Sequence, residues 1–156
     1  MIICGTGHRP NKVGGYSKEA FDRLERLAYN WIHTYRPEKI ISGGALGWDQ
    51  ALAQAAVFHG VPLVMALPFN GFECKWPRES QLFLHSLMEE ADEIVYVCES
   101  GYAPWKMQER NKWMVDNSDA VLALWNGTPG GTANCVKYAL TGNKEIINLW
   151  NKYEES

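Results

Sequence analysis

Short apolar runs alternate with helix-forming segments along the whole chain, and this alternation most narrowly limits the possible folds. The runs are four to six residues long and largely apolar on both faces, which is typical of parallel strands covered by helices on both sides. They lie at 1–4, 39–42, 62–67, 93–98, 120–125 and 145–150. The pattern predicts an α/β fold: a Rossmann-like, doubly wound, mainly parallel sheet of about six strands with helices on both faces.

The length of the chain fits one domain. Its 156 residues are close to the size of about 100–150 residues that is commonest for a single domain. We expect one domain over 1–150 and a polar C-terminal tail over 151–156. The hydrophobic fraction of 46% and the charged fraction of 21% are those of a folded chain and exclude a disordered one.

Charge, cysteine spacing and hydropathy exclude several classes of function. The formal net charge of −3 opposes a general attraction to nucleic acid. The four cysteines form no C-x-x-C pair, and no histidine stands at a zinc-like spacing from them, so neither a metal nor a cofactor is predicted. There is no signal-peptide pattern, and no apolar run reaches the roughly 18 residues of a membrane span. We therefore predict a cytoplasmic protein with no membrane partner.

The turn after the first predicted strand carries ligand-binding chemistry. In doubly wound folds, ligands bind where the strands end. Gly5 and Gly7 let the backbone approach a ligand closely, Thr6 adds a hydroxyl, and Arg9 adds a guanidinium that suits phosphate. Taken alone, this loop is explained equally well as a tight turn with a surface arginine.

The turn after the second strand predicts an anion site. Ser42, Gly43 and Gly44 stand between an apolar strand and an alanine-rich helix, whose N-terminus offers free N–H groups and partial positive charge. Asp49, in the first turn of that helix, could accept a hydrogen bond from a ribose hydroxyl. For Asp49 alone we favour the other interpretation, an acid that stabilises its own helix.

A second turn of the same design follows the fifth strand. Gly130 and Gly131 precede Thr132, which is predicted to cap the next helix. Two such turns in one small sheet are hard to explain structurally, so we predict phosphate or nucleotide binding. Glu109 and Arg110 are predicted on the helix after the fourth strand. The alternative to a role in ligand binding is that they belong to a solvated, charged face of this helix.

Three motifs, in order, resemble the signature of the lysine-decarboxylase-like LOG proteins. They are Met-Gln-Glu-Arg-Asn-Lys-Trp-Met at 107–114, Ser-Asp-Ala at 118–120 and Pro-Gly-Gly-Thr at 129–132. The glycine-rich second turn is also similar. The ordered set resembles the SLOG superfamily, which includes the DNA-processing protein A (Smf) fold and small bacterial and phage proteins. This resemblance implies a Rossmann-like domain that binds nucleotides or nucleotide-derived ligands, and it implies a homo-oligomer because SLOG relatives commonly pair through helices.

The resemblance also implies a possible reaction. LOG enzymes hydrolyse the N-glycosidic bond of nucleoside 5′-monophosphates, and by this match Arg110 would contact the sugar. The phosphate would be held by Gly43, Gly44, Gly130, Gly131 and Thr132. The family's glutamate in the last turn has no counterpart, since Asn134 and Cys135 stand in that region. Glycoside cleavage needs a carboxylate, for which Glu109 and Asp49 are the candidates. We rank binding of a nucleotide-like small molecule above a phosphoribohydrolase activity in which Glu109 and Arg110 would be catalytic.

Single-stranded DNA binding is a further alternative. It would use a local basic patch with stacking tryptophans, drawn from Lys75, Arg78, Lys106, Arg110 and Lys112 with Trp76, Trp105 and Trp113. The net charge of the chain counts against this hypothesis, and we favour the interpretation that these lysines and arginines are solvated surface residues. Trp48, Trp105 and Trp125 are predicted beside strand ends, where they could stack on a base or bury a subunit interface.

Overall fold

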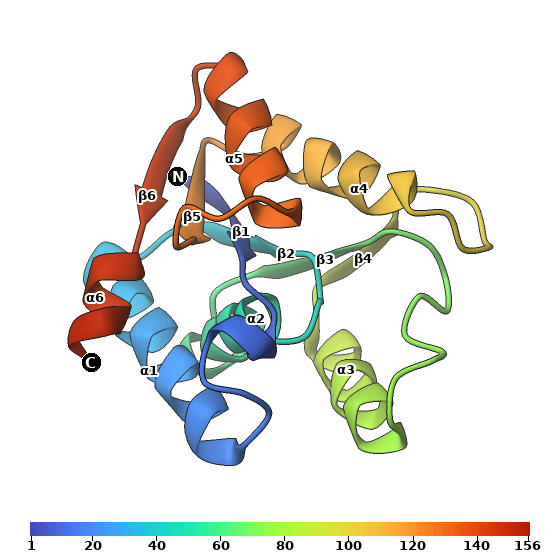
Figure 1. The fold of residues 1–156 in the computed structure, drawn as a ribbon, viewed down its shortest axis with the longest axis horizontal. Helices are drawn as coiled ribbons and strands as arrows, with labels where there is room; N and C mark the ends of the chain where they lie inside the picture. Colours follow the sequence, from blue (N-terminus) through green and yellow to red (C-terminus); the bar gives the residue numbers. More distant parts are fainter.

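The computed structural model describes residues 1–156 as a six-stranded sheet flanked by helices (Figure 1). The strand order is β4-β3-β2-β1-β5-β6, and every neighbouring pair is parallel. The strands are β1 (Ile2–Gly7), β2 (Lys39–Ser42), β3 (Leu63–Leu67), β4 (Glu93–Tyr96), β5 (Ala120–Leu124) and β6 (Glu145–Asn148). The predicted fold class is confirmed.

Helices cover both faces of the sheet (Figure 1). On one face lie α1 (Lys18–Tyr35), α2 (Trp48–His59) and α3 (Arg78–Glu90); on the other lie α4 (Trp105–Asp116) and α5 (Gly131–Thr141). Local signals set several ends: the Ser17 hydroxyl accepts the N–H of Ala20 at 3.1 Å to cap α1, and Gly60 ends α2 in the left-handed conformation. None of these helices is both long and apolar enough to cross a lipid bilayer.

The C-terminal segment differs from the predicted polar tail. Residues Trp150–Glu155 form a sixth helix, α6, which packs against α1. Tyr153 is buried, and the guanidinium of Arg23 lies 4.0 Å from the centre of its ring. The buried ring of Tyr153 and the cation stacked on it help to hold this segment against α1.

The apolar core is unequal on the two faces of the sheet. A cluster of 23 buried residues lies on the side of α1, α2 and α3, whereas the cluster beneath α4 and α5 has nine. Helix α2 is buried on most sides, because it lies between α1, α3 and the sheet. Its alanines at 51, 53, 55 and 56 are small enough for these close neighbours.

The direction of winding reverses between β1 and β5. The chain moves outward from β1 through β2 and β3 to β4, then returns to place β5 on the other side of β1. The connections that leave the carboxyl ends of β1 and β5 therefore run to opposite faces of the sheet. Such a switch point opens a crevice, which is where ligands bind in this class of fold.

Two glycines of β1 bring α2 against the strand. A Cβ on Gly7 would lie 2.4 Å from Cδ1 of Trp48, and one on Gly5 would lie 2.4 Å from Cδ2 of Leu52. Trp48 is fully buried, and its indole N–H donates to the carbonyl of Leu122 at 3.3 Å. The prediction that Trp48 stacks on a ligand or forms an interface is therefore wrong, since the missing Cβ atoms leave space for the indole within the core.

Hydrogen bonds join the loops after β1 and β5. Nε2 of His8 accepts the backbone N–H of Asn126 at 3.0 Å. Oδ1 of Asn126 accepts from the backbone N–H and the hydroxyl of Thr128, at 3.0 and 2.6 Å. Lys12, at the end of the 3₁₀ turn Pro10–Lys12, donates to the same hydroxyl at 2.8 Å. The loops after β1 and β5, which flank the switch point, are thus joined by side-chain hydrogen bonds.

We expect Gly7→Ala to lower the free energy of unfolding by about 1–3 kcal/mol, the usual cost of overpacking a core. The new methyl group would displace Trp48, and with it the start of α2. Chemical denaturation measures the change. Gly131→Ala is the matched control, because nothing lies within 4 Å of an added Cβ there, and it should stay within about 0.5 kcal/mol of wild type. Equal stability of the two variants would contradict this packing.

We expect His8 to titrate below its ordinary pKa of 6.5, chiefly because burial disfavours the imidazolium. The native state then binds fewer protons than the unfolded state near pH 6.5. His8 therefore stabilises the fold above this pH, and that stabilisation is lost as the pH falls through 6.5 toward the lower folded-state pKa. An NMR titration of the His8 ring measures the midpoint, and a value at or above 6.5 would refute the expectation.

Candidate functional site

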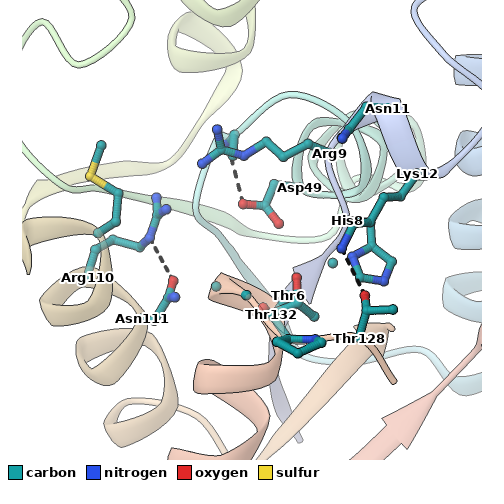
Figure 2. A pocket seen from close by; sticks show the side chains of 16 residues that line it. Thr6, His8, Arg9, Asn11, Lys12, Asp49, Arg110, Asn111, Thr128 and Thr132 are labelled. Atoms are coloured by element: carbon teal, nitrogen blue, oxygen red, sulfur yellow. Dashed lines mark hydrogen bonds between the residues drawn. The ribbon is translucent and has the colours of Figure 1, made fainter. Parts of the chain in front are cut away.

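A pocket of about 310 Å³ lies at the switch point, between the loops after β1 and β5 (Figure 2). Four segments form its walls: the loop after β1, the start of α2, the first turns of α4 and the start of α5. Eight of the predicted site residues line it: Thr6, Gly7, Arg9, Asp49, Arg110, Gly130, Gly131 and Thr132. Residues from four distant parts of the sequence therefore converge on one site.

The glycine-rich turn after β2, formed by Ser42, Gly43 and Gly44, lies beneath this pocket and does not line it. The hydroxyl of Ser42 donates to the carbonyl of Asp49 at 2.7 Å and accepts the N–H of Gly44 at 3.2 Å. A Cβ on Gly43 would lie 2.7 Å from Nη1 of Arg110. This turn positions Asp49 and Arg110, and Gly5 likewise acts by packing against α2.

Glu109 and Arg110 point in different directions, because successive helical residues are about 100° apart. Glu109 lies on the solvent side, 3.7 Å from Nζ of Lys112, and it does not line the pocket. Arg110 is buried and lines the pocket; its Nη1 donates to the carbonyls of Gly43 and Ala66, and its Nε donates to Asn111 at 3.0 Å. The guanidinium is therefore held in one orientation.

Asp49 is the only carboxylate-bearing residue in the pocket lining, and it is 6% exposed. Its Oδ2 accepts the backbone N–H of Ala45 at 3.4 Å. Its Oδ1 is the only buried side-chain nitrogen or oxygen in the protein without a hydrogen-bond partner. Leaving a buried acceptor without a partner lowers the free energy of unfolding by about 1–3 kcal/mol. Burial raises the pKa of Asp49, and the charges of Arg110 and Arg9 oppose this rise.

Positive charge outweighs this carboxylate. Arg9, Lys12 and Arg110 all line the pocket, in a chain whose net charge is −3. The N-terminus of α5 adds to them. The predicted cap by Thr132 is not formed: Gly130 is the N-cap, and no side chain bonds to the free N–H groups of the first turn. These N–H groups and the helix dipole favour an anion at the start of α5.

Sequence reasoning did not select several lining residues: His8, Asn11, Lys12, Ala45, Met107, Asn111, Thr128 and Pro129. Lys12 was detectable, because it follows Arg9 within the same strand-to-helix connection. Its proximity to Thr128 was not, since it depends on the turn Pro10–Lys12. Trp105 is exposed and outside the lining, and Trp125 donates to the carbonyl of Thr128 at 2.8 Å.

Comparison with known proteins identifies a sequence relative and solved structures of similar fold. The uncharacterized SPbeta prophage-derived protein YoqJ of Bacillus subtilis (strain 168) is 33% identical over 134 residues, which cover 76% of this chain and 78% of YoqJ. DNA processing protein A from Helicobacter pylori, described for its single-stranded DNA binding mode, has a TM-score of 0.67 at 20% identity. That match covers 95% of this chain and 64% of the other, so this chain spans less than two thirds of it. The molybdenum cofactor carrier protein from Chlamydomonas reinhardtii has a TM-score of 0.62 at 16% identity, covering 99% and 80%.

The model of the YspA SLOG family matches residues 3–148, a span that reaches from β1 to the end of β6 and includes every segment that lines the pocket. The resemblance to the SLOG superfamily is thereby confirmed, and the chain belongs to the YspA SLOG family.

Proposed function

We propose that this protein binds a phosphate-bearing, nucleotide-like ligand in the switch-point pocket. The observation that carries this proposal is the convergence of Arg9, Lys12 and Arg110 on the uncapped start of α5, in a chain of net charge −3. Backbone N–H groups and fixed guanidinium groups are the donors that phosphate prefers in proteins.

The size of the pocket favours a small ligand. Its volume of about 310 Å³ is at the lower end of the range of about 300–1,000 Å³ for ligand pockets. The predicted basic patch for single-stranded DNA is also dispersed. Lys106 donates to three backbone carbonyls and Lys112 lies beside Glu109, so neither is free for a nucleic acid backbone. Of the five cations predicted for the patch, only Arg110 lines the pocket, and we therefore favour a small molecule over nucleic acid.

Hydrolysis of the N-glycosidic bond is the second candidate, because the pocket holds a carboxylate next to Arg110. Of the two candidate carboxylates, Asp49 lines the pocket and Glu109 does not, which favours Asp49 as the acid/base. An Asp49→Asn variant would then lose all release of free base, whereas Glu109→Gln would retain it. Chromatography of nucleoside monophosphates after incubation with the protein measures this. Because we rank binding above hydrolysis, we expect the wild-type protein to leave the nucleotides intact.

We expect nucleoside 5′-monophosphates to bind the wild-type protein and to bind Arg9→Ala at least about tenfold more weakly, the result of losing roughly one charge-assisted hydrogen bond. Arg9 is exposed at the pocket rim, so its removal should not disturb the fold. Isothermal titration in a phosphate-free buffer, with the four common monophosphates and inorganic phosphate, measures the affinities.

Arg26→Ala is the matched control for charge. Arg26 is an exposed arginine of α1 that does not line the pocket, and its removal should leave binding unchanged. Equal losses in the two variants would show that net charge, and not the pocket, governs binding. Absence of binding to every ligand in the panel would refute the proposed function.

A further inference from the structure

The unpartnered oxygen of Asp49 constrains what the pocket can hold. Asp49 stands in the first turn of α2, where an acid can stabilise its own helix, and its Oδ2 already performs a local role by accepting the N–H of Ala45. Its Oδ1 has no such role, yet it is buried and belongs to a residue that lines the pocket. Figure 2 shows the carboxylate projecting into the pocket between Arg9 and Thr6. A buried acceptor of this kind is normally satisfied by a donor, and the pocket that Asp49 lines is where a ligand can supply one.

The donor does not come from the cations of the pocket. Neither Arg9 nor Arg110 forms an ion pair with Asp49. The guanidinium of Arg110 is directed to the carbonyls of Gly43 and Ala66 and to Asn111. The phosphate of a ligand would be repelled by the carboxylate of Asp49, because both carry negative charge. Within a nucleotide, the remaining donors are the neutral O–H and N–H groups of the sugar and the base.

We infer that Asp49 accepts a hydrogen bond from a ribose hydroxyl, so that the pocket selects ribonucleotides over ligands that lack this hydroxyl. This inference rests on the proposed function. A phosphate at the start of α5 places the sugar next to it, since the two are joined directly, and the ribose hydroxyls are then the donors closest to the phosphate. A charged acceptor gives such a bond more strength than a neutral one and makes its loss costly.

The test uses adenosine 5′-monophosphate and its 2′-deoxy, 3′-deoxy and 2′,3′-dideoxy forms, which share base and phosphate. We expect the wild-type protein to bind the dideoxy form at least about tenfold more weakly than the ribonucleotide, with one of the single-deoxy forms accounting for most of the loss. In Asp49→Asn, which keeps the shape of the side chain, the ratio between the two forms should fall toward one.

The matched control is Glu19→Gln, which changes the acid at the corresponding first-turn position of α1 on an exposed surface. It should keep the wild-type ratio. If the wild-type protein binds the ribo and dideoxy forms equally, the inference is overturned while the proposed function stands. If it binds none of the four, both fail. The comparison of ligands on the wild-type protein decides the matter even if Asp49→Asn does not fold.

Discussion

The contact between Trp48 and Gly7 sets the position of the first turn of α2 relative to the end of β1, on which the pocket depends. It presses the start of α2 against the end of β1, so the first turn of α2 and the loop after β1 share one corner of the pocket. Asp49 follows Trp48 directly and is carried into the pocket by the same contact. A side chain at Gly7 would separate the strand from the helix, because interiors are packed too densely to absorb a methyl group at this distance.

A second constraint is the satisfaction of buried polar groups. Arg110 and Lys106 are both buried on α4, and each is bonded to backbone carbonyls of other segments. The absence of a Cβ at Gly43 leaves space for the guanidinium of Arg110. Against this background of satisfied groups, the free oxygen of Asp49 is the exception. An exception of this kind calls for a partner from outside the protein chain, such as a water, an ion or a ligand.

Much of the architecture was predictable, because the period of apolar residues and the position of glycines are local properties of the sequence. The strand-helix alternation predicted the parallel sheet, and most of the residues singled out after β1 and β5 line the pocket at the switch point. The functions of the glycines were harder to assign. Gly43 and Gly44 resemble a phosphate loop in sequence, but they hold Arg110 and the hydroxyl of Ser42. The homo-oligomer implied by the SLOG resemblance stays a prediction.

The sequence by itself determined the fold class, the superfamily and the edge of the sheet at which the pocket lies, since these depend on periodicity and on the order of motifs. Only the tertiary structure decided which side chains of each turn or helix face the pocket. Glu109 and Arg110 are adjacent in sequence, yet one pairs with Lys112 at the surface and the other is buried in the pocket wall. Trp48 and Asp49 are likewise adjacent, and one enters the core while the other lines the pocket. The physical reason is that helical rotation sends neighbouring side chains in different directions, and only packing against the sheet fixes which direction points inward.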